Sequence, residues 1–315
     1  RIERQSAFVT NLTTGMDQII VGQKHLVESL LIGLLSDGHV LLEGVPGLAK
    51  TLAIKTLASL IDAKYSRIQF TPDLMPSDVL GTTVFNMKTN GFDFHQGPIF
   101  ADIVLVDEIN RAPAKTQAAL FEVMEERQIS IDGTTHRMGE LYTILATQNP
   151  VEQEGTYKLP EAQLDRFLMK ITMDYPSLEE EVNILERHHT NATLVKLDNI
   201  TPSIKKEELL SLRAFMNQVF VDRTLLQYIA LIVQQTRTSK AVYLGASPRA
   251  SVAMLQSSKA YALLQGRDFV TPEDIKFVAP YVLQHRLILT AEAEMEGYSP
   301  VKVTQRLIDK VEVPK

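Results

Sequence analysis

The first half of the chain alternates between short apolar runs and longer segments in which apolar residues recur every three or four positions. The short runs predict strands, and the longer segments predict helices. The expected strands are residues 39–42, 65–70, 102–108 and 141–149, and the expected helices are residues 18–35, 52–61 and 112–126. This alternation favours a mostly parallel sheet covered by helices on both faces, a scaffold typical of nucleotide-binding proteins.

Two further segments of the first half predict β-hairpins. Residues 79–100 contain Asn90-Gly91 between alternating apolar residues, and residues 127–138 contain Asp132-Gly133. Asn-Gly and Asp-Gly are the pairs that two-residue hairpin turns prefer. We therefore expect each segment to form two antiparallel strands.

The second half of the chain has a helical pattern. Residues 177–189 predict a helix, a polar stretch follows, and residues 207–289 are interpreted as helices. Ser247 and Thr271 each precede a proline, which is typical of the first residues of a helix. We place a domain boundary near residues 185–200, with an α/β core at residues 1–190 and a smaller all-α domain at residues 191–315.

Composition narrows the possible functions. The 315 residues carry a formal net charge of −6, which disfavours a nucleic-acid partner because phosphate contacts need concentrated Lys and Arg. The absence of cysteine excludes disulfides and thiolate metal sites. The N-terminal segment does not resemble a signal peptide, and no apolar run approaches the roughly 20 residues that span a bilayer. These features predict a cytoplasmic protein without direct membrane insertion.

Residues 41–51, LLEGVPGLAKT, predict a phosphate-binding loop. Gly44, four intervening residues, Ala49, Lys50 and Thr51 match a Walker A loop except for the residue before the lysine. Glycines let backbone N–H groups turn toward phosphate oxygens at the start of the next helix, where the helix dipole also favours negative charge. Lys50 would reach the terminal phosphates of ATP, and the Thr51 hydroxyl would bind Mg²⁺. The predicted nucleotide contacts are Gly44, Val45, Pro46, Gly47, Leu48, Ala49, Lys50, Thr51 and Leu52.

The segment IVLVDEIN predicts the second half of the same site. Asp107 and Glu108 follow four apolar residues, so both carboxylates emerge at the carboxyl end of a buried strand, where ligands of open α/β sheets bind. Asp107 would hold Mg²⁺ through water, and Glu108 would orient or deprotonate the attacking water. Taken alone, the loop is compatible with an ordinary Gly-Pro turn and the acids with a solvated strand end. Their order and spacing together favour a nucleotide site.

The sequence resembles the MoxR family of AAA+ ATPases over nearly its whole length. The resemblance is carried by GVPGLAK, QFTPDLMPSDVLG, GPIFADIVLVDEINRAP, QAALFEVMEE, ATQNP, LPEAQLDRF and GASPRA. The loop of this family looks like GVPGLAKT, which accounts for Ala49. The resemblance implies an AAA+ P-loop core followed by a helical lid, with ATP and Mg²⁺ as cofactors.

The resemblance also implies roles outside the two Walker motifs. Asn149 resembles sensor 1, beside the attacking water or the γ-phosphate. Arg249 resembles sensor 2, aimed at the γ-phosphate across the cleft between core and lid. Val21 and Gly22 resemble the segment that packs against adenine. Arg166 resembles the arginine finger, which acts on the nucleotide of a neighbouring subunit and implies a homo-oligomer, expected to be a hexameric ring.

Plainer interpretations of these residues stay open. Arg166 could pair with Asp165 at the surface, Asn149 could simply open an Asn-Pro turn, and Arg249 could be a surface charge. The resemblance further implies that the hairpin of residues 79–100, together with that of residues 127–138, projects toward the ring pore or a client.

The leading functional hypothesis is ATP-driven, chaperone-like remodelling, assembly or activation of a protein client. The resemblance implies a von Willebrand factor A domain protein as a partner. One alternative is the motor of a metal chelatase, which would need a subunit-docking extension that this sequence does not display. Another is a nucleic-acid motor of the helicase-loader kind, whose hairpins should be rich in Lys and Arg, whereas residues 79–100 contain only Lys88. A third is a nucleotide-gated scaffold with negligible turnover.

Overall fold

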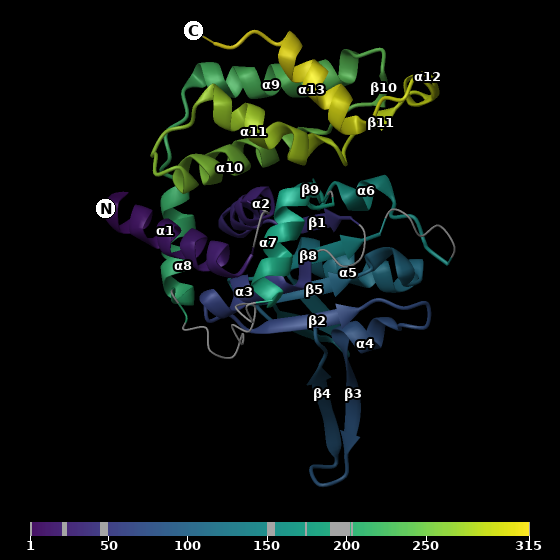
Figure 1. Cartoon of the computed structure of the whole chain (residues 1–315). Coiled ribbons are helices and arrows are strands. Elements are labelled where there is room, and N and C mark those ends of the chain that lie inside the picture. The colour runs from purple at the N-terminus through teal and green to yellow at the C-terminus, as the bar shows by residue number, and fades with distance from the viewer. Residues whose placement is uncertain are drawn as a thin grey trace.

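The computed structural model describes residues 2–20, 24–44, 50–149, 155–173, 175–189, 202 and 204–314 (Figure 1). The helices are α1 (Ile2–Ile19), α2 (Lys24–Leu35), α3 (Lys50–Leu60), α4 (Pro76–Leu80), the 3₁₀ turn η1 (Ile109–Arg111), α5 (Ala114–Glu126), α6 (Glu161–Leu164), α7 (Leu178–His189), α8 (Lys206–Met216), α9 (Arg223–Thr238), α10 (Pro248–Leu264), α11 (Pro272–Leu283), α12 (Ala291–Met295) and α13 (Pro300–Lys310). The strands are β1 (Val40–Glu43), β2 (Tyr65–Gln69), β3 (Gly81–Asn86), β4 (Gly91–Gln96), β5 (Ile103–Asp107), β6 (Gln128–Ile131), β7 (Thr134–Arg137), β8 (Thr143–Gln148), β9 (Met169–Thr172), β10 (Val242–Leu244) and β11 (Ile288–Leu289).

The core sheet has five parallel strands in the order β2-β5-β8-β1-β9, which confirms the predicted sheet. Its register aligns Val40 of β1 with Leu145 of β8 and Met169 of β9. β5 is buried along its whole length, as expected for a central strand covered on both faces. Because all five strands run the same way, their last residues meet along one side of the sheet, here called the carboxyl edge. The opposite side is the amino edge.

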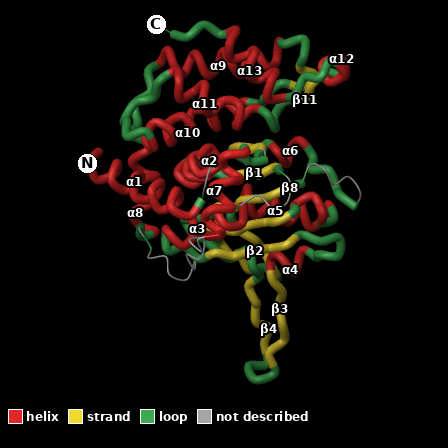
Figure 2. The backbone as a smooth tube through the Cα atoms, viewed as in Figure 1, coloured by secondary structure: helices red, strands yellow, loops and turns green. Residues whose placement is uncertain are grey.

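Alternate residues of the strands contribute to two separate apolar cores. Leu105 of β5 belongs to the larger core, which includes α1, α2 and α3, whereas Val104 and Val106 pack with Leu120 and Phe121 of α5. This follows from the period-two alternation of side chains along a strand. Helices therefore cover both faces of the sheet (Figure 2). The larger core continues into helices α8 to α11 of the second half.

Both predicted hairpins are confirmed. In the β3–β4 hairpin Phe85 lies opposite Phe92, and β6 pairs antiparallel with β7. Asn90 and Asp132 turn the chain with φ of +52° and +49°, the left-handed conformation that Asn and Asp tolerate best among non-glycine residues. The β3–β4 hairpin projects from the body of the molecule at the end far from α9 and α13 (Figure 1).

The second half is helical, with two corrections to the expected pattern. β10 and β11 form a small antiparallel sheet, so the expected all-α domain contains a strand pair. These strands of three and two residues are too short to give a periodic signal. The expected helix at residues 18–35 is also wrong at its start, because α1 ends at Ile19 and α2 begins at Lys24.

α10 and α11 begin after Ser247 and Thr271, as predicted. The Ser247 hydroxyl, however, donates to the Asp165 carboxylate rather than capping its own helix. α7 and α8 lie on either side of the predicted domain boundary, whose position stays a prediction. Within the part of the chain that the structure describes, no helix is long and apolar enough to cross a membrane.

Candidate active site

The carboxyl edge brings three of the predicted site segments together. Gly44 follows β1, Asp107 ends β5, and Asn149 follows β8, the strand between β5 and β1 in the sheet. The Gly44 N–H donates to the Gln148 carbonyl at 3.3 Å, which ties the start of the phosphate loop to the strand that carries Asn149. The parallel strand order alone therefore creates this juxtaposition.

The predicted phosphate loop lies partly outside the described residues. Val45, Pro46, Gly47, Leu48 and Ala49 are among those not described, as are Val21 and Gly22 of the predicted adenine segment. α3 begins at Lys50, so Lys50, Thr51 and Leu52 form the first turn of the helix, as a phosphate loop requires. Leu52 packs against the larger core and anchors this turn. The predicted phosphate and adenine contacts themselves stay predictions.

Asp107 is a nearly buried carboxylate with two partners. Its Oδ1 accepts from the Thr147 hydroxyl at 3.1 Å, and its Oδ2 lies 2.6 Å from the Arg67 guanidinium. The hydrogen bond to Asp107 raises the pKa of Arg67, so the Arg67 guanidinium is charged at neutral pH. Thr147 also accepts from the Glu108 N–H at 3.1 Å and thus links both acids to β8.

Glu108 occupies a strained turn. Its backbone is left-handed, with φ 55° and ψ 51°, a conformation that costs a non-glycine residue about 1–2 kcal/mol. The turn takes the chain out of β5 and into η1, and Gln117 holds η1 by donating to the carbonyls of Ile109 and Ala112 at 3.1 Å. The Glu108 carboxylate lies 3.1 Å from Arg111 and remains partly exposed. Strained residues of this kind concentrate at functional sites.

The donors at the carboxyl edge fit a magnesium-bound nucleotide. Mg²⁺ takes oxygen ligands and usually keeps several waters beside one or two protein groups and the substrate phosphates. The Thr51 hydroxyl and the Asp107 carboxylate are such groups, and Asp107 already balances a positive charge from Arg67. Within the described ranges no group of three or more His, Cys, Asp or Glu could hold a metal by itself. A metal at this edge would therefore share its ligands with phosphate.

Arg166 and Arg249 lie at the amino edge, away from Gly44 and Asp107. Both arginines contact the Glu125 carboxylate, Arg249 at 2.7 Å and Arg166 at 3.5 Å. They line one hollow together with residues 36–39, which precede β1. The sheet separates the two edges, whereas the sequence predicts that Arg249 faces its own nucleotide across a cleft. The catalytic roles of both arginines stay predictions.

Asp165 does not pair with Arg166, which corrects the plainer interpretation of Arg166. The Asp165 Oδ1 lies 2.6 Å from Arg286, and its Oδ2 accepts from the Ser247 hydroxyl at 3.1 Å. Both partners come from the second half of the chain. Asp165 therefore joins the segment before β9 to the helical domain.

Three residues near the predicted groups were missed by sequence reasoning, namely Arg67, Thr147 and Glu125. Thr147 carried a usable signal, since it is a hydroxyl residue two positions before Asn149, directly after the apolar run Ile144–Ala146. Arg67 could be found only from the pairing of β2 with β5. Glu125 could be found only from its tertiary contacts with Arg166 and Arg249.

Comparisons with known proteins agree with this architecture. Residues 39–169 match the family model described as "ATPase family associated with various cellular activities (AAA)", and residues 234–309 match the AAA lid domain. The crystal structure of a candidate ATPase from Cytophaga hutchinsonii superposes with a TM-score of 0.91 at 41% identity, covering 100% of this chain and 97% of that one. The fold and site thus define a nucleotide-binding ATPase of the AAA class with a lid domain, and the protein hydrolyses ATP.

Similar sequences narrow the class to a family. "Chaperone MoxR1" of Mycobacterium tuberculosis is 46% identical over 312 residues, which cover 95% of this chain and 80% of that protein. "Uncharacterized protein YeaC" of Bacillus subtilis is 45% identical over 302 residues, which cover 95% and 92%. The chain belongs to the MoxR family of AAA+ ATPases.

Proposed function

We propose that this protein uses Mg²⁺-dependent ATP hydrolysis in a ring to remodel, assemble or activate a protein client. The observation that carries the ATPase site is the placement of Asp107 and Glu108 at the carboxyl edge, linked through Thr147 to the strand beside Gly44. The name of the M. tuberculosis relative, a chaperone, supports the client role.

Each residue at the carboxyl edge has a chemical task in this proposal. The Thr51 hydroxyl and, through water, the Asp107 carboxylate hold Mg²⁺, which neutralises charge on the phosphates. Lys50 contacts the terminal phosphates. Glu108 orients the attacking water and accepts its proton, and Asn149 positions the water or the γ-phosphate.

The position of the two arginines supports assembly into a ring. β1 has four residues and spans about 13 Å, so a group at the amino edge is separated from a nucleotide at the carboxyl edge by at least that length. Arg166 and Arg249 therefore act on the nucleotide of a neighbouring subunit. A head-to-tail contact of this kind repeats into a closed ring when its rotation closes, and we propose a hexamer.

The projecting hairpin supports a protein client. Met87 and Phe92 on the β3–β4 hairpin are 88% and 73% exposed, and Val84 and Phe85 are also exposed. Apolar side chains of this kind bind polypeptide rather than phosphate backbone, which disfavours a nucleic-acid motor. A von Willebrand factor A domain protein is the proposed partner.

The catalytic part of the proposal is tested with Glu108→Gln. This variant should bind ATP with wild-type affinity in calorimetry, while phosphate release falls by about 10²–10⁴-fold because the general base is lost. Glu126→Gln, the same change at an exposed position that ends α5, is the matched control and should hydrolyse ATP normally. Wild-type turnover by Glu108→Gln would remove Glu108 from the mechanism.

The client part is tested by capture from a native lysate. Glu108→Gln with ATP should retain a protein that wild type releases, and Lys50→Ala with ATP should retain none because it cannot bind nucleotide. Equal capture by the two variants would contradict nucleotide-dependent client binding.

A further inference from the structure

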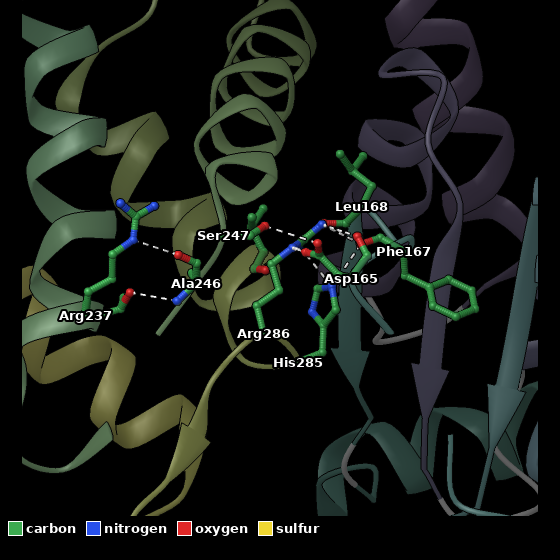
Figure 3. Close-up of polar contacts among 10 residues, drawn as sticks. Asp165, Phe167, Leu168, Arg237, Ala246, Ser247, His285 and Arg286 are labelled. Atoms are coloured by element: carbon green, nitrogen blue, oxygen red, sulfur yellow. Dashed lines mark hydrogen bonds and ion pairs between the residues drawn. The ribbon is translucent and has the colours of Figure 1, made fainter. Parts of the chain in front are cut away.

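The residues that follow α11 attach the lid to the strand segment that carries Arg166. Gln284, His285 and Arg286 make polar contacts with the segment 165–172, which begins before β9 and includes it. Figure 3 shows the contacts that His285 and Arg286 make with this segment. This attachment joins residues about 120 positions apart in sequence. We call it the lid clamp.

Arg286 is the centre of the lid clamp. Its side chain is 2% exposed, and its Nε donates to the Asp165 carboxylate at 2.6 Å. Nη1 donates to the carbonyls of Leu168 at 3.0 Å and Val282 at 2.6 Å, and Nη2 donates to the carbonyls of Asp165 at 3.1 Å and Phe167 at 2.8 Å. A guanidinium has five N–H donors, so these five acceptors satisfy it completely. A buried cation is tolerated only when it is paired this fully.

Two neighbours of Arg286 extend the lid clamp. The His285 Nε2 lies 2.9 Å from the Phe167 carbonyl, and burial, reinforced by the Arg286 charge, lowers the pKa of His285 well below its ordinary value. His285 is therefore neutral and adds no second charge at neutral pH. The Gln284 amide donates to the Lys170 carbonyl and accepts from the Thr172 hydroxyl at 3.2 Å.

The lid clamp encloses the backbone of Arg166. The carbonyls of Asp165 and Phe167, on either side of Arg166, both accept from the same Arg286 nitrogen. Figure 3 shows Arg286 and Ser247 meeting Asp165 from the lid side. Ser247 precedes α10, in which Arg249 is the second residue. One network therefore fixes the backbone near both arginines.

We propose that Arg286 is a positioning residue for the arginine finger. It makes the lid and residues 165–168 move as one body, so a rotation of the lid in one subunit moves Arg166 relative to the nucleotide of the next subunit. Arg286 itself touches no nucleotide. This inference rests on the proposed function, specifically on Arg166 acting between subunits.

The decisive experiment compares Arg286→Gln with a matched lid variant. Arg286→Gln should bind ATP within about twofold of wild type but hydrolyse it about 10–100-fold more slowly, because a misplaced catalytic group loses rate steeply. Arg267→Gln also breaks an arginine–carboxylate pair, to Asp274 at 2.5 Å, but this pair lies inside the lid. Arg267→Gln should keep wild-type turnover per assembled ring even if its melting temperature falls.

Mixed rings separate positioning from general damage. Arg286→Gln subunits keep an intact nucleotide site, and Glu108→Gln subunits keep a correctly placed Arg166. A site is therefore active where the nucleotide is bound by an Arg286→Gln subunit and the neighbouring Arg166 comes from a Glu108→Gln subunit. With random equal mixing in a cyclic ring, about one quarter of the sites should regain wild-type turnover. No recovery, or normal turnover by Arg286→Gln alone, would overturn the inference. If Arg286→Gln does not fold, the same mixing experiment is made with Asp165→Asn, which keeps the side-chain size and leaves Arg286 in place.

A second mixture separates this inference from the function on which it rests. Arg166→Ala subunits mixed with Glu108→Gln subunits should also recover activity. If they do not, the intersubunit finger is wrong and the proposed function fails with it. If they recover while both the Arg286→Gln and the Asp165→Asn mixtures do not, the finger stands and only the role of Arg286 is rejected.

Discussion

The Arg67 guanidinium lies 2.6 Å from the Asp107 carboxylate and joins the neighbouring strands β2 and β5 at the carboxyl edge. The Asp107 side chain is 11% exposed, whereas that of Arg67 is 48% exposed. The carboxylate assigned to Mg²⁺ therefore has a protein cation beside it in the free protein. Arg67 limits the cost of holding a nearly buried charge until Mg²⁺ and ATP bind.

Arg67→Gln should therefore destabilise the free protein. Removing one partner leaves the Asp107 charge poorly compensated, and a hydrogen bond to a charged group contributes about 1.5–3 kcal/mol. We expect a loss of that size in the free energy of unfolding, measured by urea denaturation. Saturating Mg²⁺ and ATP should reduce the difference in the free energy of unfolding between Arg67→Gln and wild type, because the metal replaces the missing positive charge.

The control for Arg67 is Arg223→Gln, which removes an exposed arginine at the start of α9. Its effect should stay within about 0.5 kcal/mol, as for ordinary surface changes. If Arg67→Gln and Arg223→Gln behaved alike, the ion pair to Asp107 would contribute nothing to stability.

Arg249 should act on a neighbouring subunit rather than on its own nucleotide. It shares the Glu125 carboxylate with Arg166 at the amino edge. Arg249→Ala should bind ATP but hydrolyse it more slowly, and mixing it with Glu108→Gln should restore phosphate release to about one quarter of the wild-type rate per ring. An arginine that served its own site could not be rescued in this way, so unchanged activity of the mixture would refute the assignment.

The sequence predicted those parts of the site that depend on local pattern. Parallel strands place Gly44, Asp107 and Asn149 at one edge, and the strand pattern was visible in the spacing of apolar residues. The hairpin turns followed from Asn90-Gly91 and Asp132-Gly133, because the turn chemistry is local.

The parts that could not be predicted depend on tertiary contacts. The pairing of Asp165 with Arg286 spans 121 positions, and no local pattern selects one arginine among the 32 basic residues. The start of the Arg249 helix was predicted correctly, but the contact of Arg249 with Glu125 was not. In both cases the missing information was how the lid packs, which is a property of the assembled molecule.

His39 should make the protein less stable as the pH falls below 7. Its Nδ1 accepts from the Ile144 N–H at 2.9 Å and its Nε2 donates to the Met124 carbonyl at 3.2 Å, an arrangement that requires the neutral ring. Burial, with a smaller contribution from Arg127, lowers the pKa of His39 to about 4. At pH values between about 4 and 6.5, His39 is protonated in the unfolded chain but neutral in the folded protein. The unfolded chain therefore binds one more proton in this window, and the free energy of unfolding decreases as the pH falls.

The expected size of this effect is about 2 kcal/mol from His39 between pH 7 and pH 5, and burial of His285 adds to it with the same sign. Urea denaturation at both pH values measures it. His39→Gln should be less stable at pH 7 but should lose less on acidification than wild type. If wild type and His39→Gln lost equal stability between pH 7 and pH 5, groups other than His39 would cause the pH dependence.

Gly33→Ala should destabilise the packing of α2 on β1, the strand that leads into the phosphate loop. A new Cβ at Gly33 would lie 2.4 Å from Cγ2 of Val40, a fully buried β-branched side chain that cannot rotate away. Overpacking of this kind costs about 1–3 kcal/mol, whereas the gain in helix propensity is at most about 1 kcal/mol, so the loss should prevail. Urea denaturation should show a lower midpoint with an unchanged slope. Gly91→Ala, whose new Cβ would meet no atom closer than 3.8 Å, is the matched control and should leave the midpoint nearly unchanged. A midpoint for Gly33→Ala equal to that of wild type would mean that α2 can shift away from β1 at little cost.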